Sequence, residues 1–158
     1  MINDLKLGIS IVLAISLCGC DSENHRSDAT EAESVVLALD AIKALHQNDT
    51  NLLEHCIMAS SFDPNLRVYI RRLLRQQDNL KAVALLNQHI DLWIVGKIAD
   101  SRPNPFPDNN DGVDIVSLVR NIAAHRREYP WVPTGELVRT TIQGALDHAQ
   151  NLPNANRK

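Results

Sequence analysis

The chain has 158 residues, which is enough for one domain with a sizeable core. Its 44% of hydrophobic and 22% of charged residues are typical of a folded protein, and with only 4% aromatic residues the core must be mainly aliphatic. A net charge of −3 excludes the strong positive field of a typical nucleic-acid-binding protein, so we expect no nucleic-acid partner.

The N-terminal segment differs in composition from the remainder. A weakly positive start, "MINDLK", precedes the uncharged run "LGISIVLAISL", which is shorter than the roughly 20 residues that a membrane-spanning helix needs. Leu17, Cys18, Gly19 and Cys20 follow. This order resembles the lipobox of bacterial lipoproteins, with a leucine three residues before the modified cysteine and a small residue directly before it. The alternative, an ordinary buried N-terminal helix, would not require this order of charged, apolar and small residues.

The resemblance implies that residues 1–19 are a signal peptide that is removed, and that Cys20 carries diacylglycerol and usually an acylated amine. Two or more acyl chains anchor a protein stably, whereas a single chain binds membranes only marginally. Asp21 resembles the signal that retains enterobacterial lipoproteins in the inner membrane. We therefore expect a lipid-anchored protein that faces the periplasm, in the inner membrane by the Asp21 signal, with the outer membrane as the alternative.

The three cysteines then leave one thiol in the mature chain. Removal of Cys18 and acylation of Cys20 leave Cys56, so no intramolecular disulfide can form. The apolar neighbours of Cys56 at helical spacing favour a small buried hydrophobic residue over a reactive thiol. His55 does not form a catalytic pair with it, because adjacent helical residues point in different directions.

Residues 20–30 are expected to form the lipidated cysteine and a flexible polar tether, residues 31–152 an α-helical domain, and residues 153–158 a disordered tail. Apolar residues recur at helical spacing and no segment alternates at period two, which predicts an all-α bundle of about six helices. Thr30-x-x-Glu33 predicts a capped start for the first helix, and the second helix is expected around residues 52–60.

Three further boundaries have local signals. Asp63 and Pro64 predict the N-cap and first turn of the third helix, and "QQDN" at 76–79 predicts a break before the fourth. The fourth helix is apolar over most of its circumference, so we expect it to be the most buried and to place Trp93 in the core. Thr134 predicts the cap of the last helix.

An oxygen-rich segment, "PDNNDGVD", has some features of a calcium-binding loop. The residues with candidate oxygen ligands are Asp108, Asn110, Asp111 and Asp114. Aligning Gly112 with the invariant glycine of an EF-hand puts Pro107 and Leu118 at the first and last ligand positions, where neither binds calcium. We therefore interpret the segment as a turn followed by the helix cap Asp111-x-x-Asp114, and expect no metal.

Two clusters are candidates for partner binding. The first consists of the arginines of one predicted helix: Arg67, Arg71, Arg72 and Arg75. Such a face is commonly just solvated, but so concentrated a patch on an acidic protein also suits an acidic partner protein or anionic lipid headgroups. The second lies around "HRREYPWVPTGE" and comprises Arg126, Arg127, Tyr129 and Trp131. These residue types dominate protein–protein hot spots, with the alternative that Trp131 folds inward and closes one end of the bundle.

Catalysis has little support in the sequence. The six histidines include no i, i+4 pair, and there is no glycine-rich phosphate loop, nucleophile elbow or metalloprotease motif. We expect no enzyme and no cofactor. The remaining hypotheses are a membrane-anchored inhibitor that binds a protein, similar in size and location to secretion-system immunity proteins, and a structural accessory of an envelope assembly or secretion machine.

Overall fold

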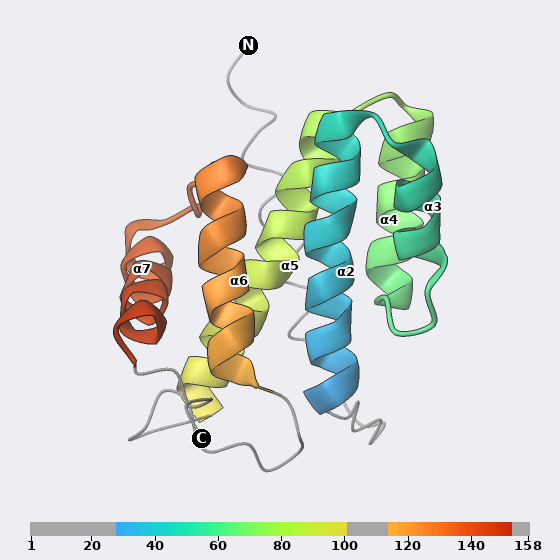
Figure 1. Ribbon diagram of the computed structural model, residues 1–158. Coiled ribbons are helices and arrows are strands. Elements are labelled where there is room, and N and C mark those ends of the chain that lie inside the picture. Colours follow the sequence, from blue (N-terminus) through green and yellow to red (C-terminus); the bar gives the residue numbers. More distant parts are fainter. Residues whose placement is uncertain (1–27, 101–113, 153–158) are drawn as a thin grey trace, which may run out of the picture.

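A computed structural model describes residues 28–100 and 114–152, and these form helices without any strand (Figure 1). The helices are α2 (Asp28–Gln47), α3 (Thr50–Met58), α4 (Pro64–Arg75), α5 (Asn79–Asp100), α6 (Ile115–Glu128) and α7 (Glu136–Asn151). The predicted all-α bundle of about six helices is confirmed. The expected signal peptide, Cys20, Asp21 and the C-terminal tail lie outside the described residues. Among the residues that are described, no helix is both long and apolar enough to cross a membrane.

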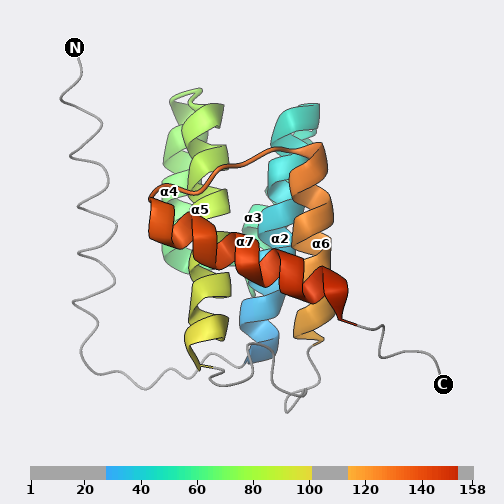
Figure 2. The same ribbon diagram turned by 90° about the vertical axis from the view of Figure 1, so that its left-hand side faces the viewer.

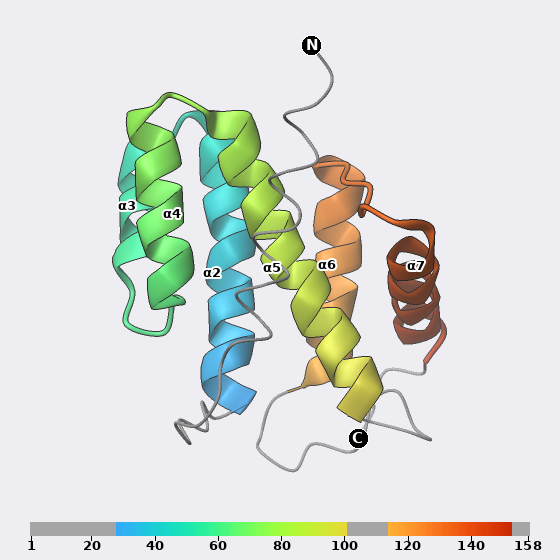
Figure 3. The ribbon, with the colours of Figure 1, turned by 180° about the vertical axis from the view of Figure 1, so that it is seen from behind.

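The helices surround a pair formed by α2 and α5, which pack along each other. The hairpin of α3 and α4 covers one side of this pair, with α3 against α2 and α4 against α5 (Figure 1). On the other side α6 contacts α2, and α7 runs across α5 and α6 at a steep angle (Figure 2). Seen from behind, α5 lies obliquely between α2 and α6 (Figure 3), and it also contacts α4 and α7.

The core is largely aliphatic, as the composition predicts. Among its largest fully buried side chains are Ile42, Ile70, Leu86 and Ile90, joined by Phe62 from the turn between α3 and α4. Trp93 is buried, which confirms its predicted place in the core. The prediction that the helix at 80–99 would be the most buried is wrong: among the residues whose burial is described, α2 contributes more buried side chains than α5. The apolar side chains around α5 contact several neighbouring helices, but Leu80 and Leu92 remain exposed.

Side-chain caps determine where several helices begin. Asp63 Oδ1 accepts hydrogen bonds from the backbone N–H of Asn65 and Leu66 at 2.8 and 2.9 Å, with Pro64 in the first turn, as predicted. The predicted break is also confirmed, because α4 ends at Arg75 and α5 begins at Asn79, with Gln77 in the left-handed region between them.

Other predicted boundaries need correction. The first helix begins at Asp28, so Thr30 lies inside it and the end of the expected tether is helical. The second begins at Thr50, because Asp49 Oδ1 accepts from the N–H of Leu52 and caps it. Asp114 is itself an N-cap, bonded to the N–H of Ser117, whereas Asp111 and the rest of the calcium-like segment lie outside the described residues.

Thr134 is not the cap of the last helix. The N-cap of α7 is Gly135, which makes no side-chain hydrogen bond and has a φ of 92°. This backbone conformation favours glycine, so a turn rather than a capping hydroxyl sets the start of α7.

Candidate functional site

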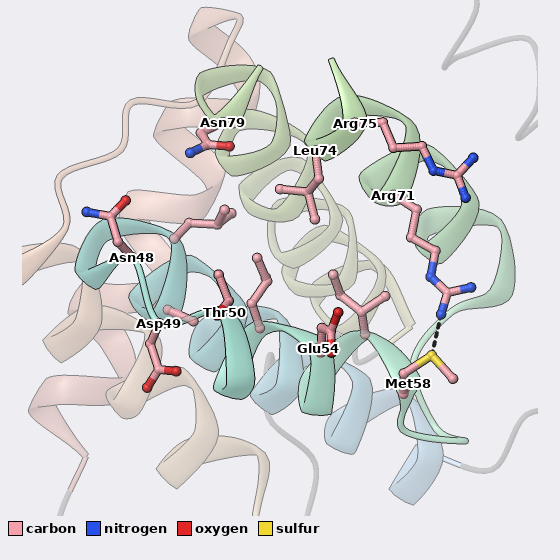
Figure 4. A pocket seen from close by; sticks show the side chains of 13 residues that line it. Asn48, Asp49, Thr50, Glu54, Met58, Arg71, Leu74, Arg75 and Asn79 are labelled. Carbon is pink, nitrogen blue, oxygen red and sulfur yellow. Dashed lines mark hydrogen bonds between the residues drawn. The ribbon is translucent and has the colours of Figure 1, made fainter. Parts of the chain in front are cut away.

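A groove lies between α3 and α4, where these helices face one another without close packing (Figure 4). Each is held mainly by a different helix of the central pair, α3 by α2 and α4 by α5. The groove has a volume of about 650 Å³ and is closed at one end by the start of α5. Its lining residues are Ala44, Leu45, Asn48, Asp49, Thr50, Leu53, Glu54, Ile57, Met58, Arg71, Leu74, Arg75 and Asn79.

The floor of the groove is apolar. Leu53 and Ile57 lie one turn apart on α3, with Leu45 of α2 behind them and Leu74 of α4 opposite. These side chains belong to the core cluster or pack against it, which makes the floor part of a rigid bundle. Helical periodicity buries one face of α3 and one face of α4. It therefore also places apolar atoms at the edge of the space between these two helices.

The two walls of the groove carry opposite charges. Asp49 and Glu54 stand on the α3 side, and Arg71 and Arg75 on the α4 side (Figure 4). All four residues are exposed, and within the described residues none of them forms an ion pair. Arg71 donates a hydrogen bond to the sulfur of Met58, which brings its guanidinium across one end of the groove. Asp49 is partly satisfied as the cap of α3, whereas Glu54, Arg71 and Arg75 present charges to which no described residue supplies an ionic partner.

The arginine cluster predicted from the sequence is divided by the fold. Arg71 and Arg75 line the groove, whereas Arg72 is exposed on the same helix and does not line it. Arg67 turns back to its own chain, where Nη2 donates to the carbonyl oxygens of Ala59 at 2.7 Å and Phe62 at 3.3 Å. Arg67 therefore holds the turn between α3 and α4 together, and only two of the four arginines belong to the groove.

The second cluster is also divided. Arg126 is not a surface arginine: its side chain is 9% exposed and forms an ion pair with Asp91 of α5, which is also buried. Trp131 Nε1 donates to the other carboxylate oxygen of Asp91 at 2.9 Å, which favours the inward orientation of this indole. Asp91 was missed by the sequence analysis, although a lone acid within the apolar stretch "LLNQHIDLWIVG" was a usable signal for a buried partner.

Arg126, Arg127 and Trp131 line a second depression of about 370 Å³ between α6 and α7, together with Arg139 of α7. Tyr129 lies elsewhere, stacked on His46 of α2 with ring centroids 4.8 Å apart, and it also contacts His125 at 4.8 Å. The structure therefore brings three of the four residues of this cluster to one depression and leaves Tyr129 outside it.

Nothing in the described residues assembles reactive groups around an accessible space. Ser34 Oγ and His89 Nε2 are 3.1 Å apart, but Ser34 is 1% exposed and neither residue lines the groove or the second depression. Cys56 is buried, and burial, with a smaller effect of Asp40, raises the pKa of its thiol to about 11. In the part of the chain that the structure describes, no group of acidic, histidine or cysteine side chains is arranged to hold a metal ion.

A scan against protein-family models found no matching family, and searches of curated proteins and of solved structures found no matching protein. The groove is the feature of the described domain best suited to recognition, since it combines apolar surface with unneutralised charge.

Proposed function

We propose that this protein is a lipoprotein, anchored to the membrane through Cys20 and facing the periplasm, whose helical domain binds a partner protein in the α3–α4 groove. We further propose that it acts as an inhibitor of the immunity-protein type, neutralising a toxin that acts in the cell envelope. The observation that carries the proposal is the groove itself, an apolar floor between two oppositely charged walls.

The physical properties of the groove suit protein recognition. Most of the binding energy of a protein interface comes from a centre that is excluded from water, and the polar groups around this apolar centre select the partner. Arginine is enriched in such interfaces because its planar guanidinium makes several directed hydrogen bonds to carboxylates. Arg71 and Arg75 meet this description, since both are exposed beside the apolar residue Leu74.

The lipid anchor supports the inhibitor role by restricting where the domain works. A protein held at the periplasmic face of a membrane by two or more acyl chains meets its partner at that surface. Such a location suits the neutralisation of a protein that enters or attacks the envelope.

The test uses the anchor-free protein, residues 22–158, as bait in an envelope extract of the producing bacterium. We expect the wild type and the Arg72→Glu control to retain the same partner. The double variant Arg71→Glu with Arg75→Glu should bind it more slowly and with a weaker salt dependence, because exposed charges steer association. Equal association rates for all three folded proteins would remove the groove from the interface. Co-expression of the anchored protein should then protect cells from the captured partner.

A second function, as a structural accessory of an envelope assembly, is favoured by the depression between α6 and α7. It lies on the side of the bundle away from α3 and α4, so that the domain offers two separate contact surfaces (Figure 1). Simultaneous capture of two proteins, one lost on reversal of Arg71 and Arg75 and the other on reversal of Arg127 and Arg139, would support this role over that of an inhibitor.

A further inference from the structure

The apolar floor of the groove limits which kind of protein segment can bind there. Its floor consists of the apolar side chains of Leu45, Leu53, Ile57 and Leu74. The described residues contain no strand, and hence no sheet edge, with which an extended peptide could exchange backbone hydrogen bonds. An extended segment laid on this floor would lose water from its N–H and C=O groups without replacing those bonds, which is costly. A helix satisfies its own backbone groups and avoids this penalty.

The packing of the hairpin leads to the same conclusion. Because α3 and α4 are held by different helices of the central pair, they stand apart and form two sides of an open channel (Figure 4). An apolar stripe at i, i+3, i+4 and i+7 on an incoming helix is the pattern that packs into such a channel. The complementary apolar surface consists of the partly exposed Leu74 on one side and the small exposed fractions of Leu53 and Ile57, 8% and 3%, on the other.

We propose that the groove binds an amphipathic α-helix of the partner protein whose two polar flanks differ in charge. The acidic flank lies against Arg71 and Arg75, and the basic flank lies against Glu54 and Asp49. This inference rests on the proposed function, because it takes the groove to be the partner site, and it adds the chemistry of the segment that is recognised. Opposite charges on the two walls select against a helix with like charges on both flanks, since one flank would then be repelled.

The split charge also argues against an anionic lipid headgroup as the occupant. A phosphate would be attracted to Arg71 and Arg75, but Glu54 and Asp49 line the opposite wall of the same groove and would repel it. A lipid surface would be better served by walls that are both basic.

The experiment uses synthetic amphipathic helices of about 16 residues, long enough to form a helix in part, labelled for fluorescence anisotropy. All of them carry the same leucine stripe. The split peptide has Glu on one flank and Lys on the other, and the mixed peptide has the same composition with both charges on both flanks. We expect the anchor-free protein to bind the split peptide about tenfold more tightly than the mixed peptide at low salt. Equal affinities would overturn the proposal.

Reversal of one wall should change the preference in a defined direction. Arg71→Glu with Arg75→Glu makes both walls acidic, so that a peptide with Lys on both flanks becomes the tightest ligand. Glu54→Lys makes the walls mainly basic and shifts the preference toward a peptide with Glu on both flanks. Arg72→Glu, which lies outside the groove, should leave the order unchanged. The circular dichroism spectrum of each variant shows whether it is still helical. If the variant of one wall fails to fold, the variant of the other wall supplies the test.

Vesicles of phosphatidylglycerol provide the competing outcome. If they displace the split peptide and lose this ability in the Arg71→Glu, Arg75→Glu protein, the groove binds anionic lipid and the helix proposal is wrong. Selective binding of the split peptide without any groove-dependent partner in the envelope would sustain this inference while removing the proposed function. The reverse result, a groove-dependent partner with no preference among the peptides, would retain the function and overturn the inference.

Discussion

Trp131 donates its indole N–H to the carboxylate of Asp91 at 2.9 Å, joining the loop before α7 to the middle of α5. Arg126 of α6 forms an ion pair with the other oxygen of the same carboxylate. Both charged side chains of the ion pair are less than a tenth exposed. This three-residue network ties α5, α6 and the interhelical loop together, and its parts should contribute unequally to stability.

We expect Arg126→Met to destabilise the domain more than Trp131→Phe. Arg126→Met leaves a buried carboxylate without its charge partner, which costs about 3–5 kcal/mol in comparable cases. Trp131→Phe removes one hydrogen bond to the same carboxylate, at a cost of about 1–3 kcal/mol. Urea unfolding followed by circular dichroism measures both. A smaller loss for Arg126→Met than for Trp131→Phe would contradict the role of Asp91 as the charged centre of the network.

Arg67 and Arg72 should respond differently to the same substitution. Arg67→Ala removes hydrogen bonds from a charged donor to two carbonyl oxygens of the α3–α4 turn, and should lower the free energy of unfolding by about 1–2 kcal/mol. Arg72→Ala, on an exposed side chain of the same helix, should remain within about 0.5 kcal/mol of the wild type. Equal effects in urea unfolding would show that Arg67 does not stabilise the turn.

The stability of the domain should depend on pH through His125. Burial is the largest effect and lowers the pKa of His125 below its ordinary value of 6.5, while the bond between Nε2 and the carbonyl oxygen of Leu39 acts in the opposite direction. Glu128 also raises this pKa, and His46 and Arg126 lower it.

Because the unfolded chain binds a proton more readily than the folded one, the contribution of His125 is fully present above pH 6.5 and is lost as the pH falls toward its folded pKa. Unfolding in urea at about pH 7.5 and about pH 5.5 should therefore show a larger loss for the wild type than for His125→Gln. An equal loss in both proteins would exclude His125 as a source of the pH dependence.

Cys56 should be unreactive in the folded protein. Its side chain is 1% exposed, and the raised pKa of about 11 leaves little thiolate at neutral pH. A disulfide reagent such as Ellman's reagent should modify the anchor-free protein slowly in buffer and fully in urea. Rapid modification under native conditions would show that the site around Cys56 opens readily.

The proposed anchor is tested by two neighbouring cysteines. Cys20→Ser should abolish incorporation of labelled palmitate and retention in the membrane fraction, because the thiol that receives the lipid is lost. Cys18→Ser serves as the matched control and should leave both unchanged, since Cys18 is expected to leave with the signal peptide. Labelled palmitate in the Cys20→Ser protein would show that the lipobox interpretation is wrong.

The elements that the sequence predicted well are those governed by short-range chemistry. Asp63 followed by Pro64 specifies a helix start within a few residues, and the polar break at 76–79 separates two apolar stripes. The start of α7 could not be predicted from such local signals. Thr134 does not cap this helix, and the backbone conformation of Gly135 sets its start instead. The first helix likewise extends upstream of the capping pattern at Thr30.

By itself, the sequence determined the helical class of the domain, some of its helix boundaries and the burial of Cys56 and Trp93, because periodicity and capping act within a few turns of one chain segment. Only the tertiary structure decided which arginines are available. Arg71 and Arg75 line a groove because α3 and α4 are held apart by different helices, whereas Arg126 is drawn inward by Asp91, 35 residues away in the chain. The role of a charged side chain depends on the residues that the fold places beside it, and those residues are distant in the sequence. Helical periodicity, in contrast, depends on residues within one segment.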